Sequence, residues 1–511
     1  MESKSGHLLK LHFLPINMGS ISNQAFKSSI FSYLGVLIGF VTIGFLLPRL
    51  FSTGEVGVIR LILNYSEIAA RIAALGSGTL ILRYFKLFKN PNNKNNGFLT
   101  YMILINIIGF ILFFVGFQVV DDYLIDHNQS RSPLFAQYFK WILPITLSVL
   151  IFHLMDTYAT ALKLSAVGIF FREFIQRILI LFLLVGTGIF ILPFSTIIGL
   201  YMLIIISTPL LLTVYLQHNN HLGLGINLNF LNKKLLSEMG SVASFALFTG
   251  IGGTAVVFID NIMINELMGE NQTGIYSTLF FYTALILIPT KSISKIASSY
   301  VADAFVSNKI NEIKSIYYKS CLNQFIPGLL IFIFIWTNSD FIFYILPSEY
   351  QNGKYVLLIL GIGNLFNAAT GVNTQIIAFS PFHKYNTIFI IGLLIITIVS
   401  NIVFIPIYGI TGAAIATAIS LFTFNLAKFL LILLKYGLQP FDKKYLILIS
   451  ITLPILYLGS LIVIDNIFLQ STLRTILVFL LFVIPTYSLN ISPDLNAFII
   501  NLVKKYVPFS F

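Results

Sequence analysis

Long apolar runs recur along the whole 511-residue chain and are separated by short polar connections. A run of about 20 apolar residues crosses the ~30 Å hydrocarbon core of a bilayer as a helix. Backbone polar groups in lipid must be hydrogen-bonded internally, so these runs are predicted as helices and not as open strands. The pattern predicts fourteen membrane-spanning helices, near residues 27–48, 56–79, 98–119, 140–161, 169–191, 195–216, 240–265, 275–300, 322–346, 354–379, 386–406, 410–434, 445–464 and 473–490.

The charged residues of the connections alternate with the predicted helices. Lys and Arg gather in every second connection, for example in residues 83–94, 163–177 and 428–444. The opposite connections are acidic, at 121–126 and 266–270. Basic connections face the cytoplasm in membrane proteins. The pattern therefore predicts cytoplasmic N and C termini, and it explains the net charge of +12 without a nucleic-acid partner.

Composition narrows the class of protein further. The chain is 57% hydrophobic and 10% charged, whereas soluble domains are about 25% charged. Its single cysteine excludes an intramolecular disulfide, and no cluster of side chains has metal-ligand spacing. The connections are too short for a soluble catalytic domain. We therefore expect an all-α polytopic membrane protein that is not an enzyme and holds neither a metal nor a cofactor.

A weak internal repeat divides the chain. PRLFSTGEVGVIRL (Pro48–Leu61) and NELMGENQTGIYST (Asn265–Thr278) align when shifted by 217 residues, which places Gly57 on Gly274. Both copies follow a helix that runs outward, so the repeats are parallel, as in one class of transporter. The predicted organisation is a cytoplasmic segment (1–26), an N-lobe of six helices (27–220), a cytoplasmic linker (221–239), a C-lobe of six helices (240–435), and a final helix pair with a cytoplasmic tail (436–511).

Three segments resemble a known family. LGSGTLILRYF (Leu75–Phe85), FIDNIMINELMGENQTGIYS (Phe258–Ser277) and IPIYGITGAAIATAIS (Ile405–Ser420) are similar to recurring segments of Wzx-type polysaccharide (O-antigen) flippases. These belong to the multidrug/oligosaccharidyl-lipid/polysaccharide exporter superfamily, and the resemblance spans essentially the whole chain. One departure concerns the second helix. The family often has an acidic residue just before its Gly, where this chain has Ala74, and the acid here is Glu67.

The resemblance implies that the protein translocates an undecaprenyl-diphosphate-linked oligosaccharide across the bacterial cytoplasmic (inner) membrane. It implies alternating access by two lobes, a place in surface polysaccharide biosynthesis, and H⁺ or Na⁺ as the coupling ion. Membrane lipid, a polysaccharide polymerase and chain-length machinery are the implied partners. Three alternatives stay open: a small-molecule antiporter or a lipid II flippase of the same superfamily, or a membrane-embedded polysaccharide polymerase.

Charges within predicted helices are the candidates for lining a cavity, because a charge at the bilayer centre costs about 2.5–3.5 kcal/mol. Glu67 and Arg71 are four residues apart and can pair on one helix face, either as a structural ion pair or with Arg71 in the cavity. Asp260 is expected in the cavity or between the lobes, with simple packing as the alternative. Lys291 and Lys295 either reach the cavity or extend to the membrane surface.

The remaining candidates lie nearer the cytoplasmic ends of the helices or are polar. Asp156 completes the deep ionisable groups. Asn364 and Asn367 lie on one polar face that can bind sugar hydroxyls or a neighbouring helix. A last group is expected either to lie at the membrane interface or to capture the diphosphate on the cytoplasmic side: Arg83, Lys86, Arg172 and Arg177.

Overall fold

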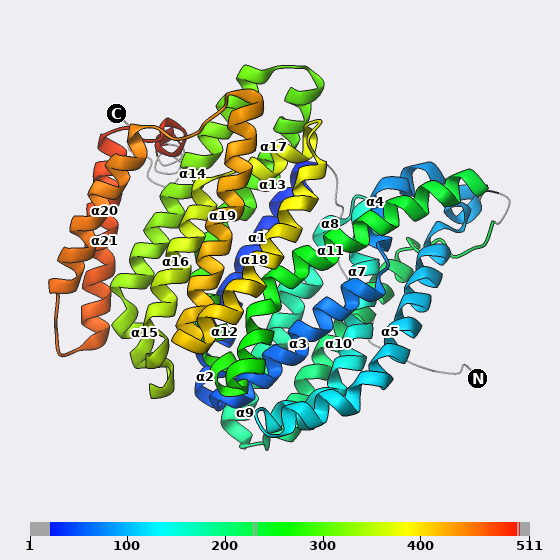
Figure 1. The fold of residues 1–511 in the computed structure, drawn as a ribbon, viewed down its shortest axis with the longest axis horizontal. Helices are drawn as coiled ribbons and strands as arrows, with labels where there is room; N and C mark the ends of the chain where they lie inside the picture. Colours follow the sequence, from blue (N-terminus) through cyan, green and yellow to red (C-terminus); the bar gives the residue numbers. More distant parts are fainter. Residues whose placement is uncertain (1–20, 228–229, 231, 498–499, 501–511) are drawn as a thin grey trace, which may run out of the picture.

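The computed structural model describes residues 21–227, 230, 232–497 and 500, and it is all-helical over these residues (Figure 1). Most of the predicted cytoplasmic segment 1–26 and the two basic residues of the predicted tail, Lys504 and Lys505, lie outside the described residues. The fold class expected from the sequence is confirmed. The side of the membrane on which the termini lie stays a prediction.

The first half of the described chain contains ten α-helices and two π-helical turns, η1 and η4. Their bounds are α1 (Ile21–Gly39), η1 (Phe40–Leu46), α2 (Leu47–Leu50), α3 (Thr53–Ala73), α4 (Ser77–Phe88), α5 (Phe98–Gln129), α6 (Pro133–Tyr138), α7 (Ile142–Ala161), α8 (Ser165–Ile169), η4 (Phe170–Ile175), α9 (Gln176–Phe190) and α10 (Phe194–His218).

The second half begins with the long helix α11. Its bounds and those of the following helices are α11 (Lys233–Met268), α12 (Glu270–Ala284), α13 (Ile288–Val306), α14 (Ile310–Thr337), α15 (Ser339–Ile345), α16 (Lys354–Ala369), α17 (Asn373–Phe379), α18 (Lys384–Tyr408), α19 (Ile410–Tyr436), α20 (Lys443–Leu461) and α21 (Ile467–Ser488).

Twelve helices of the described chain are long and apolar enough to cross a membrane. The pair α16 and α17, bent by 44°, makes a thirteenth when it is counted as one span. The predicted second span, 56–79, corresponds to α3 and α4, and its charges Arg60, Glu67 and Arg71 lower its apolarity. The prediction of fourteen membrane-spanning helices therefore exceeds the twelve to thirteen that are long and apolar enough among the described residues.

Two predicted spans are broken where a glycine adopts the left-handed backbone conformation. Gly76 (φ +77°) separates α3 from α4, and a Cβ there would lie 2.4 Å from the backbone oxygen of Ala243 in α11. Gly371 (φ +59°) separates α16 from α17, and its Cβ would lie 2.4 Å from Cys321 Sγ. A side chain at either position would be strained and would clash, so glycine lets the chain turn in close contact with another helix.

Buried apolar side chains form separate cores in the two halves of the chain. Two cores draw on residues 47–239, which we call the N-lobe, and a third draws on residues 264–491, which we call the C-lobe (Figure 1). Helix α11 joins them, because its first part packs on the N-lobe core and its last turns on the C-lobe core. The exact domain boundaries expected from the sequence remain a proposal.

The lobes meet closely at the lower end in Figure 1, which we call the closed end. There α3 and α12 cross with their backbones in contact: a Cβ on Gly57 would lie 2.0 Å from Glu270 O, and one on Gly274 would lie 1.8 Å from Thr53 O. Ser132 Oγ also donates to Asn265 Oδ1 at 2.7 Å across the lobes. The two glycines that the internal repeat superposes therefore touch each other's helices.

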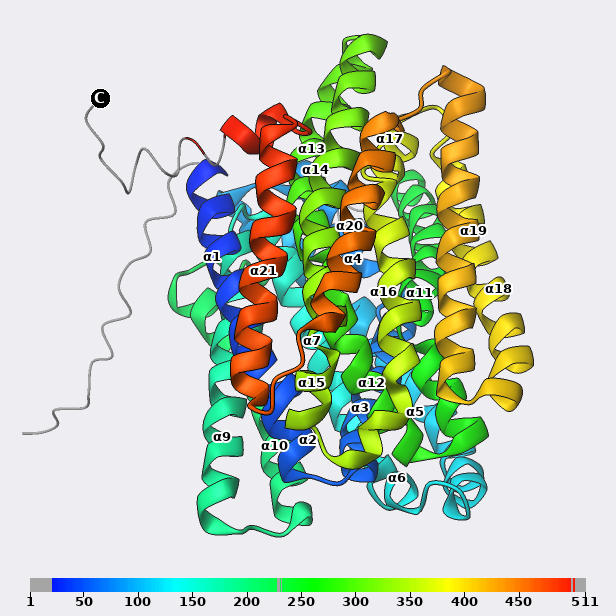
Figure 2. The same ribbon diagram turned by 90° about the vertical axis from the view of Figure 1, so that its left-hand side faces the viewer.

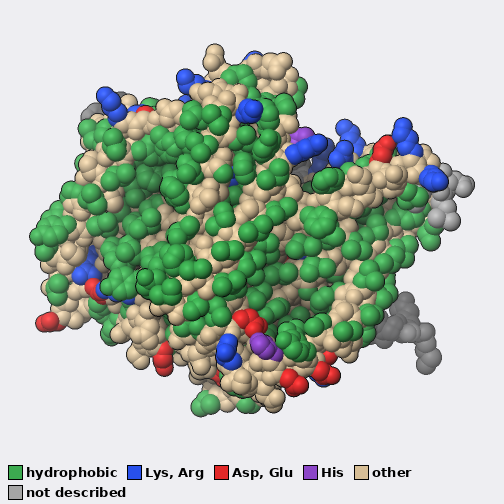
Figure 3. All heavy atoms as spheres, in the orientation of Figure 1, with side chains coloured by type: hydrophobic (Ala, Val, Ile, Leu, Met, Phe, Trp, Pro, Cys, Tyr) green, Lys and Arg blue, Asp and Glu red, His purple; other side chains and the backbone are tan. Residues whose placement is uncertain are grey.

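The surface carries an apolar belt between two charged ends. In Figure 3, Lys and Arg gather mostly along the upper edge and Asp and Glu mostly along the lower edge. In Figure 2, α1 begins and α21 ends at the same, upper end of the molecule. This distribution matches the alternation of charge that predicts both termini on the basic side.

The C-terminal pair α20–α21 packs against α14 at the edge of the C-lobe (Figure 2). Arg474 of α21 is 4% exposed, and its Nη1 donates to Thr337 O at 2.8 Å and to Asp340 Oδ2 at 3.0 Å. Its Nη2 donates to Ile462 O at 2.8 Å. One guanidinium thus ties the end of α14, α15, and the α20–α21 connection together.

Candidate functional site

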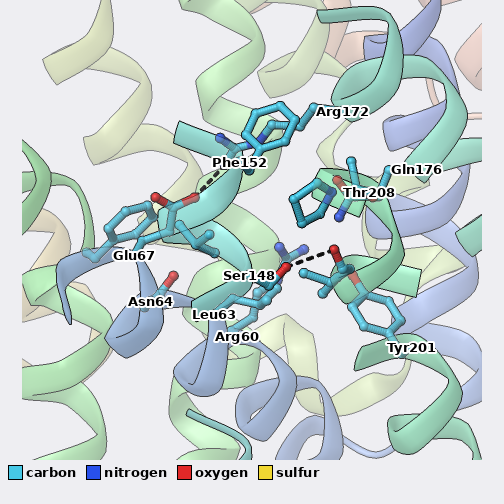
Figure 4. Close-up of a pocket in the computed structure, with 14 residues that line it drawn as sticks. Arg60, Leu63, Asn64, Glu67, Ser148, Phe152, Arg172, Gln176, Tyr201 and Thr208 are labelled. Atoms are coloured by element: carbon cyan, nitrogen blue, oxygen red, sulfur yellow. Dashed lines mark hydrogen bonds and ion pairs between the residues drawn. The ribbon is translucent and has the colours of Figure 1, made fainter. Parts of the chain in front are cut away.

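A cavity of about 220 Å³ lies within the N-lobe, between α3, α7, η4 and α10 (Figure 4). Phe258, from α11, completes its wall. Its polar and charged lining is unusual for the interior of a membrane bundle, where such groups are costly and usually functional. The polar side chains are Arg60, Asn64, Glu67, Ser148, Arg172, Gln176, Tyr201 and Thr208.

Glu67 is held by two partners from other helices. Its Oε1 lies 2.5 Å from Arg172 Nη2, and its Oε2 lies 3.0 Å from His153 Nε2. The side chain of Glu67 is 13% exposed. Arg172 also lies over the ring of Phe152, with its Cζ 5.4 Å from the ring centroid. This arrangement fixes one ion pair on the cavity wall and leaves part of the Arg172 guanidinium accessible.

The predicted ion pair between Glu67 and Arg71 is wrong. In the described structure Glu67 pairs with Arg172, and the Nε atom of Arg71 is buried without a hydrogen-bond partner. A spacing of four residues identifies side chains of one helix that can pair. Here Glu67 pairs instead with Arg172, a residue of a neighbouring helix. Arg71 lies near the last turn of α3, outside the residues that line the cavity.

The polar and charged residues of η4 and of the first turn of α9 lie on two faces. Arg172 and Gln176 face the cavity, whereas Glu173 and Arg177 pair at 2.5 Å and lie against α1. The Arg177 guanidinium donates to Gly35 O and occupies the space beside Gly39, so a side chain at either glycine would clash. Of the two arginines predicted for diphosphate capture here, only Arg172 reaches the cavity.

Arg60 and Asn64 are two of the six polar cavity residues that were not predicted from the sequence; the others are Ser148, Gln176, Tyr201 and Thr208. Arg60 is assigned to an outer connection by the charge pattern, but it lines the cavity from α3. Its Nε and Nη2 atoms and the Nδ2 atom of Asn64 are buried without a partner in the described structure. Leaving such a donor unpaired costs about 1–3 kcal/mol. The sequence does contain a pattern that indicates this polar face. Polar or charged residues recur every three or four positions along α3, at Arg60, Asn64, Glu67 and Arg71.

Asp156 lies deep in the N-lobe but outside the cavity lining. A Cβ on Gly168 of α8 would lie 1.7 Å from Asp156 Oδ1, so α8 approaches this carboxylate closely. Gly168 precedes Arg172 by four residues, which places Asp156 near the same helix face as the ion pair. The structure thus groups Asp156 with Glu67, His153 and Arg172 without placing it at the cavity wall.

Asp260 of α11 is buried against helices of the C-lobe and is 4% exposed. It accepts hydrogen bonds from three helices: Tyr276 Oη donates at 2.8 Å, Asn401 Nδ2 donates at 2.7 Å, and the Thr417 hydroxyl also donates. No Lys or Arg of the described chain lies within 4 Å of its carboxylate. The structure therefore places Asp260 in a hydrogen-bonded site of the C-lobe and not in the N-lobe cavity.

The other predicted residues stay apart from the cavity. Asn364 donates to Thr283 O at 3.0 Å, and Asn367 accepts from Asn425 at 3.2 Å, so both join neighbouring helices as in the packing alternative. The exposed ones lie on α4 and α13: Arg83, Lys86, Lys291 and Lys295. Within the described residues, no group of three or more His, Cys, Asp or Glu is placed to hold a metal ion.

Known proteins support the fold. No family model matches the chain. Over 182 residues, 35% of this chain and 38% of the relative, it is 23% identical to the probable low-salt glycan biosynthesis flippase Agl15 of Haloferax volcanii. The match thus spans well under half of that relative.

Solved structures cover much more of the chain. The lipid II flippase MurJ in an inward closed conformation superposes with a TM-score of 0.66 and 14% identity, covering 92% of this chain and 99% of that one. An inward-facing multidrug resistance MATE family transporter of the MOP superfamily gives a TM-score of 0.59 at 12% identity, covering 82% and 96%. The chain therefore has the fold shared by these MATE and MurJ structures.

Proposed function

We propose that the protein flips a lipid-linked oligosaccharide, of the undecaprenyl-diphosphate type, across the bacterial cytoplasmic membrane in surface polysaccharide biosynthesis. The observation that carries this proposal is the polar cavity with Arg60, Glu67 and Arg172 inside an otherwise apolar bundle. The MurJ-like fold and the partial likeness to a glycan biosynthesis flippase support the same class.

A flippase must move a polar head group through the membrane interior while the lipid tail stays in lipid. Such a head group needs hydrogen-bonding partners at depth, because unpaired polar groups are costly there. Backbone contacts between α3 and α12 close one end of the bundle, and loosening these contacts while the opposite end closes would provide alternating access. In this proposal the exposed Lys and Arg residues of α4 and α13 attract the diphosphate.

We also propose Asp260 as the group that couples transport to H⁺ or Na⁺. Its carboxylate is buried, bonded to three helices and without a cationic partner within 4 Å among the described residues. Binding or release of H⁺ or Na⁺ at this carboxylate would alter how α11, α18 and α19 pack. A polysaccharide polymerase and chain-length machinery remain proposed partners downstream of the export step.

A small-molecule antiporter is the alternative that the MATE likeness supports, and lipid II is the alternative substrate suggested by MurJ. The MurJ structure extends over 92% of this chain and the MATE structure over 82%, which favours a lipid-linked substrate. A membrane polymerase fits less well, because the charged groups described above lie within the bundle and not on a large external loop.

The test is a gene deletion with an assay of which leaflet holds the lipid-linked units. A flippase mutant accumulates complete units that an outside probe, such as a lectin or periodate, does not reach in intact cells. A polymerase mutant instead exposes single unpolymerised units outside, and that result would exclude the proposal. Complementation by Arg172→Gln should fail, while Lys309→Gln, at an exposed site on the α13–α14 turn, serves as the matched control.

A further inference from the structure

Two residues of α3 line the cavity and carry buried hydrogen-bond donors that have no partner in the described structure. These donors are Nε and Nη2 of Arg60 and Nδ2 of Asn64. The two residues are four positions apart, so they lie on the same helix face, and Figure 4 shows both on one side of the cavity. Asn64 is 5% exposed, so bulk water does not readily satisfy its amide. An acceptor-rich group is the natural complement to this pair.

The charge of the cavity lining indicates what kind of acceptor fits. Arg172 is already paired with Glu67, so the charge of Arg60 is the uncompensated one among the lining residues. The lining therefore carries a net single positive charge. A group with one negative charge neutralises it, whereas a diphosphate brings at least two. A carboxylate matches the count, and it accepts hydrogen bonds through both oxygens.

Position and size favour the sugar part of a lipid-linked substrate. Arg60 is seven residues before Glu67, about 10 Å nearer the closed end along α3. A substrate that enters from the opposite end brings its sugars to this depth while its diphosphate stays nearer the lipid. The cavity of about 220 Å³ is larger than a cavity of about 150 Å³ that holds benzene, so it has room for one sugar ring.

We propose that Arg60 and Asn64 form a subsite for the carboxylate of an acidic sugar, such as a uronic acid unit, in the transported oligosaccharide. This inference rests on the proposed function. The guanidinium of Arg60 binds the two carboxylate oxygens, and the amide of Asn64 donates to one of them. The Tyr201 hydroxyl and the Gln176 amide, on the opposite wall, are available to the ring hydroxyls.

The test measures binding of three lipids to the full-length protein in nanodiscs by native mass spectrometry. The lipids are undecaprenyl diphosphate alone, undecaprenyl-diphosphate-linked disaccharide ending in glucuronic acid, and the same disaccharide ending in glucose. For the uronate lipid, Arg60→Gln should raise the Kd by about 10- to 100-fold, the range for hydrogen bonds to a charged group. It should leave the Kd of the other two lipids within about twofold. Arg60→Lys should restore part of the affinity.

Each other outcome has a definite meaning. If Arg60→Gln weakens all three lipids equally, Arg60 holds the diphosphate and the acidic-sugar subsite is overturned. If the natural protein binds the uronate and glucose lipids equally well, the subsite is also overturned, although the proposed function stands. If the natural protein binds none of them, the proposed function itself fails. Unchanged binding of undecaprenyl diphosphate shows that the variant is folded, and Lys309→Gln is the matched control.

Discussion

Replacing Gly274 by alanine should open the closed end of the bundle. The new Cβ would lie 1.8 Å from the backbone oxygen of Thr53, and real Cβ contacts essentially never fall below 3.0 Å. The obstacle is backbone and not a flexible side chain, so it does not rotate away. Helices α3 and α12 must therefore move apart by more than 1 Å where they cross.

The cost follows from the size of this clash. Inserting a methyl group into a well-packed contact costs about 1–3 kcal/mol. Because α3 and α12 belong to different lobes, that cost falls on the closed arrangement and not on either lobe alone. A shift of 1–3 kcal/mol changes the ratio of closed to open molecules by about 5- to 150-fold. Alanine is the better helix former by about 1 kcal/mol, but this gain stabilises the closed and the open arrangement alike and leaves their ratio unchanged.

The assay is oxidative cross-linking between cysteines introduced at positions 53 and 271. Thr53 Oγ1 and Asn271 Oδ1 lie 3.1 Å apart in the closed structure, so Thr53→Cys with Asn271→Cys reports closure. Cys321, the only native cysteine, is buried and does not compete. Adding Gly274→Ala should lower the cross-linking yield and speed the labelling of the introduced cysteine at position 53 by a water-soluble maleimide.

Gly253→Ala is the matched control, because a Cβ at that position on α11 meets nothing within 4 Å. It should leave cross-linking unchanged and raise thermal stability slightly, if at all. An undiminished cross-linking yield in Gly274→Ala, with normal export, would refute the reasoning that this backbone crossing holds the lobes together.

Three further predictions concern single side chains. Glu67→Gln should destabilise the protein by about 1–3 kcal/mol, because Arg172 loses its negatively charged partner and one oxygen remains where two accepted from Arg172 and His153, and adding Arg172→Gln should recover the melting temperature but not export. Asp260→Asn should fold with little change, since Asn401 still donates to the remaining oxygen, but export should no longer respond to ionophores that collapse the H⁺ or Na⁺ gradient. Arg474→Met should lower the melting temperature in detergent by removing bonds to Thr337, Ile462 and Asp340, while binding of lipid-linked sugar to the folded fraction stays unchanged.

The arrangement of helices could be predicted from the sequence because hydropathy acts on each helix separately. Every predicted span coincides with a helical segment in the described residues. The breaks at Gly76 and Gly371 could not be predicted, because glycine within an apolar run is common. At each break the glycine is required by close contact with an atom of another helix, the backbone oxygen of Ala243 or the sulfur of Cys321, and the sequence does not show this contact. The repeat that pairs Gly57 with Gly274 predicted related helices but not their mutual contact.

The site was predicted only in part, because its partners come from different helices. Glu67 and Arg172 were both recognised as candidates, yet local spacing assigned Glu67 to Arg71. Arg60 was missed because a charge early in a span is ordinarily counted with the preceding connection. Its periodic relation to Asn64 and Glu67 becomes informative only when the whole face of α3 is considered.

The π-helical turn at Phe170–Ile175 has a consequence for variation in chain length. A turn closed by i→i+5 bonds accommodates one more residue than an α-helical turn. Deleting a single residue there should leave a continuous α-helix whose flanking turns keep their orientation, because the wide turn already absorbs the extra residue. Within the tightened turn, however, the side chains would be redistributed, so a sequence that lacks one residue in this stretch would no longer hold Arg172 in its present position beside Glu67. Gaps within 170–175 therefore separate proteins that share this charged cavity from those that share only the fold.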